Sequence, residues 1–246
     1  MDRSLYVAMS GAKQILQAQT SNSHNLSNAN TTGFRADLEQ FRSMPVFGPG
    51  YPSRVYAMVE RPGVDFTPGV LQKTGRDLDV AIHGDGWLAV VSRDGTEAYS
   101  RAGELQLTPE GLLTTADGLA VVGNGGPIAL QPAQKIEIGA DGTISIIPLG
   151  EGATTLAVVD QIKLVNPSAD QLEKRNDGLI YMQSGTPAPA SADVKLVSGA
   201  VESSNVSAVD AMVDMIELAR RFELQVKIMK SISDNDAASA QLMRMG

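Results

Sequence analysis

Apolar residues recur at helical spacing only near the two ends of this chain. One stripe near the N-terminus has members alternately four and three positions apart, and a stripe near the C-terminus has almost the same spacing. Such spacing places the members on one helix face and is typical of paired helices. We therefore predict a long helix at each end, and we expect the two stripes to bury each other in a coiled-coil-like pair. The first stripe contains Leu5, Met9, Ala12, Leu16, Gln19, Ser23 and Leu26, and the second contains Met212, Ile216, Ala219, Phe222, Val226 and Met229.

The middle of the chain carries a different signal. Five Asp-Gly pairs lie there, and neither end has one. Asp-Gly favours a tight hairpin turn, because both residues accept the positive φ that such a turn requires. The short segments between the pairs are rich in Val and Ile, so the middle is predicted to be an antiparallel β domain. The pairs are Asp85-Gly86, Asp94-Gly95, Asp117-Gly118, Asp141-Gly142 and Asp177-Gly178.

A third kind of segment separates the first helix from the β domain. Residues 36–77 contain five prolines, which interrupt helices, so we expect an extended connector with some strand pairing. The predicted organisation is a terminal helical domain of residues 1–35 with 203–246, a connector over residues 36–77 and a β domain over residues 78–202. The expected class is α+β overall, with a mainly β middle and long helices from both termini.

Charge and composition exclude several classes of function. The net charge is −8, and residues 37–202 hold 12 basic and 21 acidic residues, so no basic face is expected for nucleic acid. The chain has no cysteine, which excludes disulfides and thiolate metal sites. No apolar segment approaches the ~20 residues that cross a bilayer, so we expect no direct membrane insertion. The first residues lack the apolar stretch of a signal peptide, so export would need a route without a cleaved signal.

The residues that usually carry catalysis are sparse. His24 and His83 are the only histidines, and neither has a nucleophile motif beside it. Residues 84–89 match a dinucleotide-binding fingerprint, but the segment that follows has the pattern of a strand where that fingerprint needs a helix. Asp77 and Asp79 alternate with apolar residues, as on a solvated or ion-paired strand face. We expect no catalytic residue, no cofactor and no metal site.

An Asn-rich segment follows the first helical stripe, at residues 22–34. Asn, Ser and Thr disfavour helix interiors because their side chains compete for backbone hydrogen bonds. One interpretation is local: Gly33 caps the helix in a left-handed conformation and Phe34 packs back. The other is that the amides bind a neighbouring chain. The spacing leaves both interpretations open.

Several of these segments resemble the signatures of bacterial flagellar rod and hook proteins. They are residues 9–12 and 30–37 near the N-terminus, residues 74–82 and 84–90 at the start of the β domain, and residues 209–228 near the C-terminus. The length is closer to that of a rod protein than to that of the longer hook protein. Proximal rod proteins are the most similar, and distal rod proteins are the nearest alternative. One departure is residues 24–28, His-Asn-Leu-Ser-Asn, where the family usually has Asn-Asn-Leu-Ala-Asn.

The resemblance implies a structural subunit of the flagellar basal-body rod, which crosses the periplasm and transmits motor torque. Such subunits polymerise helically through their terminal helices, which form the inner tube, and they are exported by the flagellar type III apparatus without a cleaved signal. Copies of the chain and other rod proteins would be its partners. The residues expected at the subunit interface are Leu5, Met9, Ala12, Leu16, Leu26, Asn25, Asn28, Met212, Ile216, Ala219, Phe222, Val226 and Met229.

Two other classes of function are weighed against this one. An enzyme could build its site from loops of the β domain, but it should then show a plausible nucleophile or base. An assembly chaperone or rod-capping factor should carry an additional domain, such as a hydrolase, and the sequence shows none.

Overall fold

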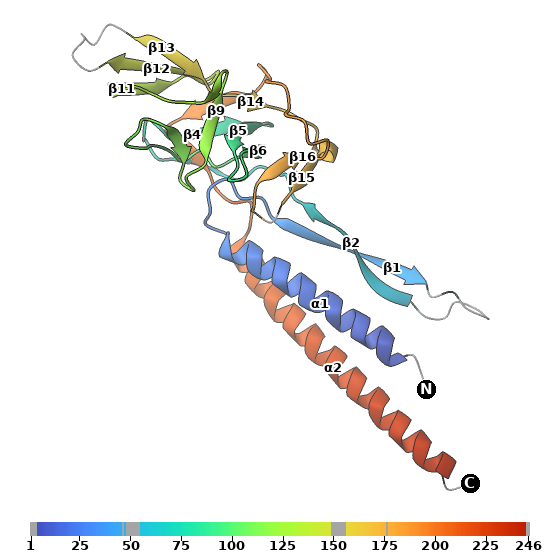
Figure 1. Cartoon of the computed structure of the whole chain (residues 1–246). Helices are drawn as coiled ribbons and strands as arrows, with labels where there is room; N and C mark the ends of the chain where they lie inside the picture. Colours follow the sequence, from blue (N-terminus) through green and yellow to red (C-terminus); the bar gives the residue numbers. More distant parts are fainter. Residues whose placement is uncertain (1–3, 46, 48–54, 149–155, 176, 245–246) are drawn as a thin grey trace. The chain divides into compact units, whose positions relative to one another are not determined.

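The computed structural model describes residues 4–45, 47, 55–148, 156–175 and 177–244, without the side chains of residues 59–62 (Figure 1). Contacts between residues divide the chain into two units. The helical unit comprises residues 1–29, 36–65 and 206–246, and the β unit comprises residues 30–35 and 66–205. The domain boundaries predicted from the sequence, as limits of independent folding, stay a prediction.

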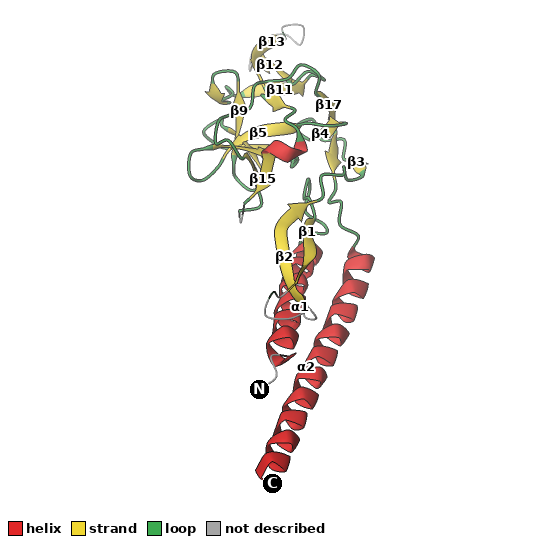
Figure 2. Cartoon of the chain, turned by 90° about the vertical axis from the view of Figure 1, so that its right-hand side faces the viewer, coloured by secondary structure: helices red, strands yellow, loops and turns green. Residues whose placement is uncertain are grey.

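The helical unit contains two long helices that lie side by side (Figure 2). Helix α1 spans Ser4–Ser27 and helix α2 spans Ala208–Arg244. They are antiparallel, because Asn22 of α1 bonds to Ala211 of α2 whereas Gly11 lies against Gln225. The predicted pair of terminal helices is confirmed.

Helix α1 ends within the Asn-rich segment. The carbonyl of His24 accepts both the backbone N–H of Asn28 (3.2 Å) and its side-chain amide (2.9 Å) in the last turn. Gly33 has the expected positive φ, 70°, but its N–H donates to the carbonyl of Glu202 in the β unit (2.8 Å). The interpretation of Gly33 as the helix cap is therefore wrong. A Cβ at this position would lie 2.2 Å from the carbonyl carbon of Arg101, so close backbone approach also requires a glycine here.

A β-hairpin also belongs to the helical unit. Strand β1 (Asp37–Pro45) pairs antiparallel with β2 (Val55–Val64), and both strands contact α1. The remaining strand of the predicted connector, β3 (Leu71–Lys73), lies in the β unit and pairs with β18 (Ala200–Glu202).

Every strand pair among the described residues is antiparallel, and the largest sheet of the β unit has nine strands. Its main path is β15-β16-β6-β5-β9-β8-β7, with β10 paired to β9 and β14 paired to β5. The strands are β5 (Trp87–Val91), β6 (Glu97–Ser100), β7 (Leu105–Leu107), β8 (Leu113–Thr115), β9 (Ala120–Gly123), β10 (Gly126–Pro127), β14 (Leu164–Val165), β15 (Leu172–Lys174) and β16 (Ile180–Met182).

Two smaller sheets and a short helix complete the β unit. A three-stranded sheet contains β11 (Ala133–Ile138), β12 (Thr143–Pro148) and β13 (Ala157–Gln161). Strand β4 (Val80–His83) pairs with β17 (Lys195–Ser198), and the 3-10 helix η1 spans Ala169–Gln171.

Four of the five Asp-Gly pairs lie in hairpin turns, as predicted, but the expected positive φ of the aspartate is wrong, since every described residue with a positive φ is a glycine. The four pairs connect β5 to β6, β8 to β9, β11 to β12 and β15 to β16, and the glycine has a positive φ in each. The fifth, Asp85-Gly86, joins β4 to β5, and these strands do not pair with each other because β4 pairs with β17. This pair connects two sheets instead.

The core of the β unit is filled by the apolar residues of these short strands. The largest cluster includes Leu88, Leu105, Leu113, Ile128 and Ile144, each at most 1% exposed. A second cluster surrounds Trp87 and Tyr99. Burying each large aliphatic side chain stabilises the fold by about 1.5–3 kcal/mol relative to its exposed state.

Gly103 allows one of the closest backbone approaches in this unit. A Cβ on Gly103 would lie 1.6 Å from the carbonyl oxygen of Val80. We expect Gly103→Ala to lower the free energy of unfolding by about 2 kcal/mol or more, because β4 must move away. Urea denaturation measures the change. Gly125→Ala is the control, since that site has open space, and its effect should stay within about 1 kcal/mol. Equal effects would contradict the close approach of Gly103 to Val80.

Tyr99 should make the stability of the β unit fall at alkaline pH. Its phenol is 1% exposed, donates to Glu97 (3.1 Å) and accepts the N–H of Ala188 (2.7 Å). Burial raises the pKa of Tyr99 from 10.0 to about 12, so folding favours the protonated phenol. The stabilisation is complete below pH 10 and is lost as the pH rises towards 12, by about 2–3 kcal/mol in total. Urea denaturation from pH 8 to 11.5 should show this loss, and a loss of the same size in Tyr99→Phe would contradict it.

Candidate functional sites

Helix α2 buries a single stripe of side chains. Its members are alternately four and three positions apart, so they share one face. The side-chain amide of Asn22 on α1 donates to the carbonyl of Ala211 in this stripe (2.7 Å), which identifies the face that meets α1. Apart from Ala208, the described residues of α2 that are not exposed are Ala211, Met215, Leu218, Phe222, Gln225, Met229 and Ile232.

Small residues characterise the buried positions of α1. Ala8, Ala12 and Ala18 are each 7% exposed. A Cβ on Gly11 would lie 3.1 Å from the amide nitrogen of Gln225, so the glycine leaves room for that long polar side chain. Small residues on α1 therefore accommodate larger side chains of α2.

The stripe predicted from the sequence lies mostly outside this contact. Met9 is 51% exposed, Leu16 48%, Met212 49%, Ile216 57% and Val226 44%. The prediction that these five residues pair α1 with α2 is wrong. In each case the residue one position earlier in the helix is buried or half-buried instead. Small residues such as Gly11, which lies against Gln225, allow closer packing of the two helices than Met and Leu would.

The other members of the predicted set lie in different surroundings. Ala12 is buried, Leu5, Leu26, Phe222 and Met229 are half-buried, and Ala219 is exposed. Their assignment to a subunit interface, together with that of the five exposed residues, stays a prediction.

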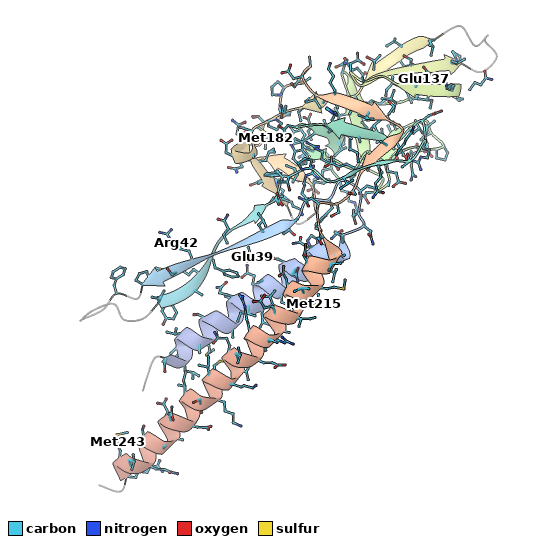
Figure 3. All side chains as sticks on the ribbon, turned by 180° about the vertical axis from the view of Figure 1, so that it is seen from behind. Glu39, Arg42, Glu137, Met182, Met215 and Met243 are labelled. Atoms are coloured by element: carbon cyan, nitrogen blue, oxygen red, sulfur yellow. The ribbon has the colours of Figure 1, made fainter. Side chains whose placement is uncertain are left out.

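The exposed surfaces of the helices are rich in apolar side chains. Residues 233–244 of α2 are all exposed, and Met243 lies in the last turn, far along the helix from Met215 (Figure 3). Exposed apolar patches of this kind mark interaction surfaces. Besides those named above, the exposed apolar residues of the two helices are Tyr6, Val209, Val213, Leu224, Ile228, Leu242 and Met243.

The predicted interface amides have partners within the chain. Asn25 accepts the backbone N–H of Asp37 (2.8 Å) and donates to its carbonyl (2.9 Å), which fastens the start of β1 to α1. His24 lies beside the same residue, with Nδ1 2.6 Å from the Asp37 carboxylate. These contacts, with that of Asn28 to His24, show that both amides have partners within the chain although Gly33 is not the helix cap, and a role for Asn25 and Asn28 between subunits stays a prediction.

The segments that were considered for catalysis form a strand and an ion pair. Residues 87–91 form strand β5, so the dinucleotide-like motif is followed by a strand, as predicted. Asp79 is 3% exposed, accepts from Thr74 (2.6 Å) and pairs with Arg76 (3.1 Å). Among the described residues, no group of three His, Cys, Asp or Glu is placed to hold a metal ion. No described helix is long and apolar enough to cross a membrane.

A buried ion-pair cluster in the β unit is not predicted from the sequence. Glu202 on β18 pairs with Arg35 (2.6 Å) and with Arg101 (2.9 Å), and all three side chains are at most 3% exposed. Both guanidinium groups also lie near the ring of Trp87, at 5.8 and 5.3 Å from its centroid. The partners are 101 and 167 positions apart, so no local pattern predicts the cluster. The one signal is Arg35 itself, which directly follows Phe34 in a segment that resembles the family.

Comparison with known proteins agrees with these features. The chain is 43% identical over 251 residues to the "Flagellar basal-body rod protein FlgF" of Escherichia coli (strain K12), and 41% identical over 251 residues to that of Salmonella typhimurium, with the whole of each chain covered. The chain belongs to the flagellar basal-body rod protein family. It is also 34% identical to the "Flagellar basal-body rod protein FlgG" of Bacillus subtilis, over all of this chain and 99% of that one.

Three family descriptions match separate parts of this rod protein. "Flagella basal body rod protein" matches residues 5–35, "Flagellar hook protein FlgE/F/G D1 domain" matches residues 81–146, and "Flagellar basal body rod FlgEFG protein C-terminal" matches residues 197–242. The first and last contain nearly all of α1 and most of α2, and the second lies within the β unit. The protein is accordingly a structural component of the flagellar basal body.

We expect the two bonds of Asn25 to stabilise the helical unit of this rod protein. Asn25→Ala leaves the N–H and carbonyl of Asp37 without the partners described above, which should cost about 1–3 kcal/mol. Amide exchange at Asp37 measures the local opening. Asn30→Ala is the matched control, because Asn30 is exposed and should give a change within about 0.5 kcal/mol. Unchanged exchange at Asp37 in Asn25→Ala would show that the amide does not hold β1.

Proposed function

We propose that this chain is a subunit of the proximal part of the rod, and that it polymerises helically through the outward faces of α1 and α2. The full-length similarity to relatives named FlgF supports the proximal assignment. The distal rod remains the alternative and is less supported, since the relative named FlgG has the lower identity, 34%.

The exposed apolar stripe of the helix pair is the observation that carries this proposal. Leu16 on α1 and Ile216 on α2 are 48% and 57% exposed although the two helices are already paired. Leaving such side chains in water forgoes about 25 cal/mol for each Å² of apolar surface, which a contact with a neighbouring subunit would recover. The inward stripe is used within the subunit, so the outward stripe remains for assembly.

A helical polymer follows if the contacting patches of neighbouring subunits are different. A contact between unlike patches leaves a free patch on each added copy, and it gives a filament when its rotation does not close a ring. The outward faces of α1 and α2 differ in sequence and length, with 24 residues in α1 and 37 in α2. This difference supports such a contact.

The proposed role is to transmit motor torque along the rod, with copies of the chain and other rod proteins as partners. It requires no catalysed reaction and no cofactor. The proposed location is the part of the basal body that crosses the periplasm, reached through the flagellar type III export apparatus without a cleaved signal. Family membership supports this location.

We expect Leu16→Asp and Ile216→Asp to abolish incorporation into the rod. Each residue is about half exposed in the subunit, so an aspartate there stays hydrated and the subunit should fold. In the assembled rod the same charge would be buried without a partner, at a cost of several kcal/mol. Immunoblotting of purified basal bodies measures incorporation.

The matched control is Gln17→Asp, because Gln17 is an exposed polar residue next to Leu16. Its variant should appear in basal bodies at the level of the unchanged chain. Cellular levels of all three variants, and urea denaturation of the purified chains, exclude loss through misfolding. If the Leu16 and Ile216 variants are incorporated normally, the outward stripe is not the polymerising surface.

A further inference from the structure

The chain passes between its two units at four places, between residues 29 and 30, 35 and 36, 65 and 66, and 205 and 206. Within the β unit, the residues next to these crossings are bonded to one cluster. Glu202 binds Arg35 through its carboxylate and Gly33 through its carbonyl, at 2.6 and 2.8 Å. The ring of Phe66 packs edge-on against Trp87, with centroids 5.6 Å apart. The two segments at residues 30–35 and 66–69 therefore meet the same group of side chains.

The residue before the last crossing, Asn205, is bonded to the same two segments. The N–H of Asn205 donates to the carbonyl of Phe34 (3.4 Å), and its side-chain amide donates to the carbonyl of Thr67 (3.1 Å). Upstream of it, Ser203 and Val70 are joined by a backbone hydrogen bond of 2.9 Å. The segment that leads into α2 is thus bonded to both of the other segments.

Two contacts fix this group to the body of the β unit. Arg101 follows β6 of the large sheet, and it binds the second oxygen of Glu202 (2.9 Å) and the carbonyl of Gly84 (2.8 Å). Lys174 on β15 donates to the carbonyl of Arg35 (2.7 Å). The Glu202 carboxylate also accepts the N–H of Gly69 (2.7 Å), so this one side chain connects three segments of the chain.

The chemistry of the cluster suits a rigid connection. Apolar contacts have little directional preference and allow sliding, whereas charge-assisted hydrogen bonds are short and fix their geometry. Glu202 and Arg35 have side chains 1% exposed, so water does not readily compete for these bonds. A force on any of the crossing segments must break directional bonds before the segment can shift.

We propose that this Glu202 cluster, made wholly of residues of the β unit, is the joint at which load carried by the chain from the terminal helices enters the β unit. The proposal rests on the rod function proposed above, because only a subunit under torque has such a load. Glu202 acts in it as a positioning residue that holds three segments through Arg35, Arg101 and Gly69.

The first test measures the joint in the purified full-length chain. Glu202→Gln leaves one acceptor oxygen where the carboxylate has two, so that oxygen must accept from all the donors around it. The buried charge-assisted bonds of the carboxylate are also lost. We expect the amides of Gly33 and Gly69 to exchange about tenfold faster or more, and the emission of Trp87, the single tryptophan, to shift. The core amides of Leu88 and Val90 should be unchanged.

Glu104→Gln is the matched control, because its carboxylate also pairs with an arginine, Arg76 (3.6 Å), but is 36% exposed. It should leave both amides and the tryptophan emission unchanged. If Glu202→Gln does not fold, Arg35→Gln gives the same test, with faster exchange at Gly33 while the bond of Gly69 to Glu202 is retained. Wild-type exchange at Gly33 and Gly69 in the folded variants would overturn the proposal.

The second test separates load transfer from mere folding stability. We expect Glu202→Gln to enter basal bodies at the wild-type level, and cells that carry it to lose a larger fraction of their swimming speed in viscous medium than wild-type cells do. An unchanged dependence of speed on viscosity, or absence of the variant from the rod, would overturn the load assignment. Failure of the proposed polymerisation through the helices is a separate outcome. It would be seen as normal incorporation of Ile216→Asp into the rod.

Discussion

The pairing of α1 with α2 is the constraint on which the rest of the structure depends. The two residues that the bond between Asn22 and Ala211 joins are 189 positions apart, so everything between them must begin and finish at one helix pair. Antiparallel hairpins meet this requirement, because each one returns the chain towards its start. The entropic cost of closing so long a segment exceeds that of a short one only modestly, since it grows with the logarithm of length. The β unit can therefore be large without weakening the helix pair.

The features that the sequence predicted are those with local causes. Helical spacing revealed a helix at each end, because the period of 3.6 residues is a property of one segment alone. Asp-Gly pairs revealed four hairpin turns, because the glycine of each pair readily adopts the positive φ that the turn requires. The strand at residues 87–91 was recognised from the pattern of its own residues, and it ruled out a dinucleotide-binding motif. In each case the decisive interaction lies within a few positions of the residue.

The features that the sequence did not predict depend on distant partners. Met9 and Ala8 are both plausible members of a helical stripe, and only the folded structure shows that Ala8 is buried and Met9 is exposed. Gly33 has the predicted conformation, but its N–H bonds to Glu202, which no local pattern could identify. The same holds for Arg35 and Arg101, whose shared carboxylate is supplied by a strand near the other end of the chain. Sequence patterns therefore predicted the helices and turns, and tertiary packing decided which of their residues are buried and which partners they bind.

If the rod assembles through the outward helix faces as proposed, their apolar character gives the assembly a temperature dependence. Burial of apolar surface is driven by entropy near 25 °C, and this driving force fades on cooling. Within a subunit the fold also has a large core, which includes Leu105 and Ile144, and the hydrogen bonds of its sheets. The proposed contact between subunits would rely mainly on side chains such as Ile216, which is 57% exposed in the single chain. Cold therefore acts first on the joins between subunits, so a rod held together in this way would come apart on cooling into pieces that are themselves still folded.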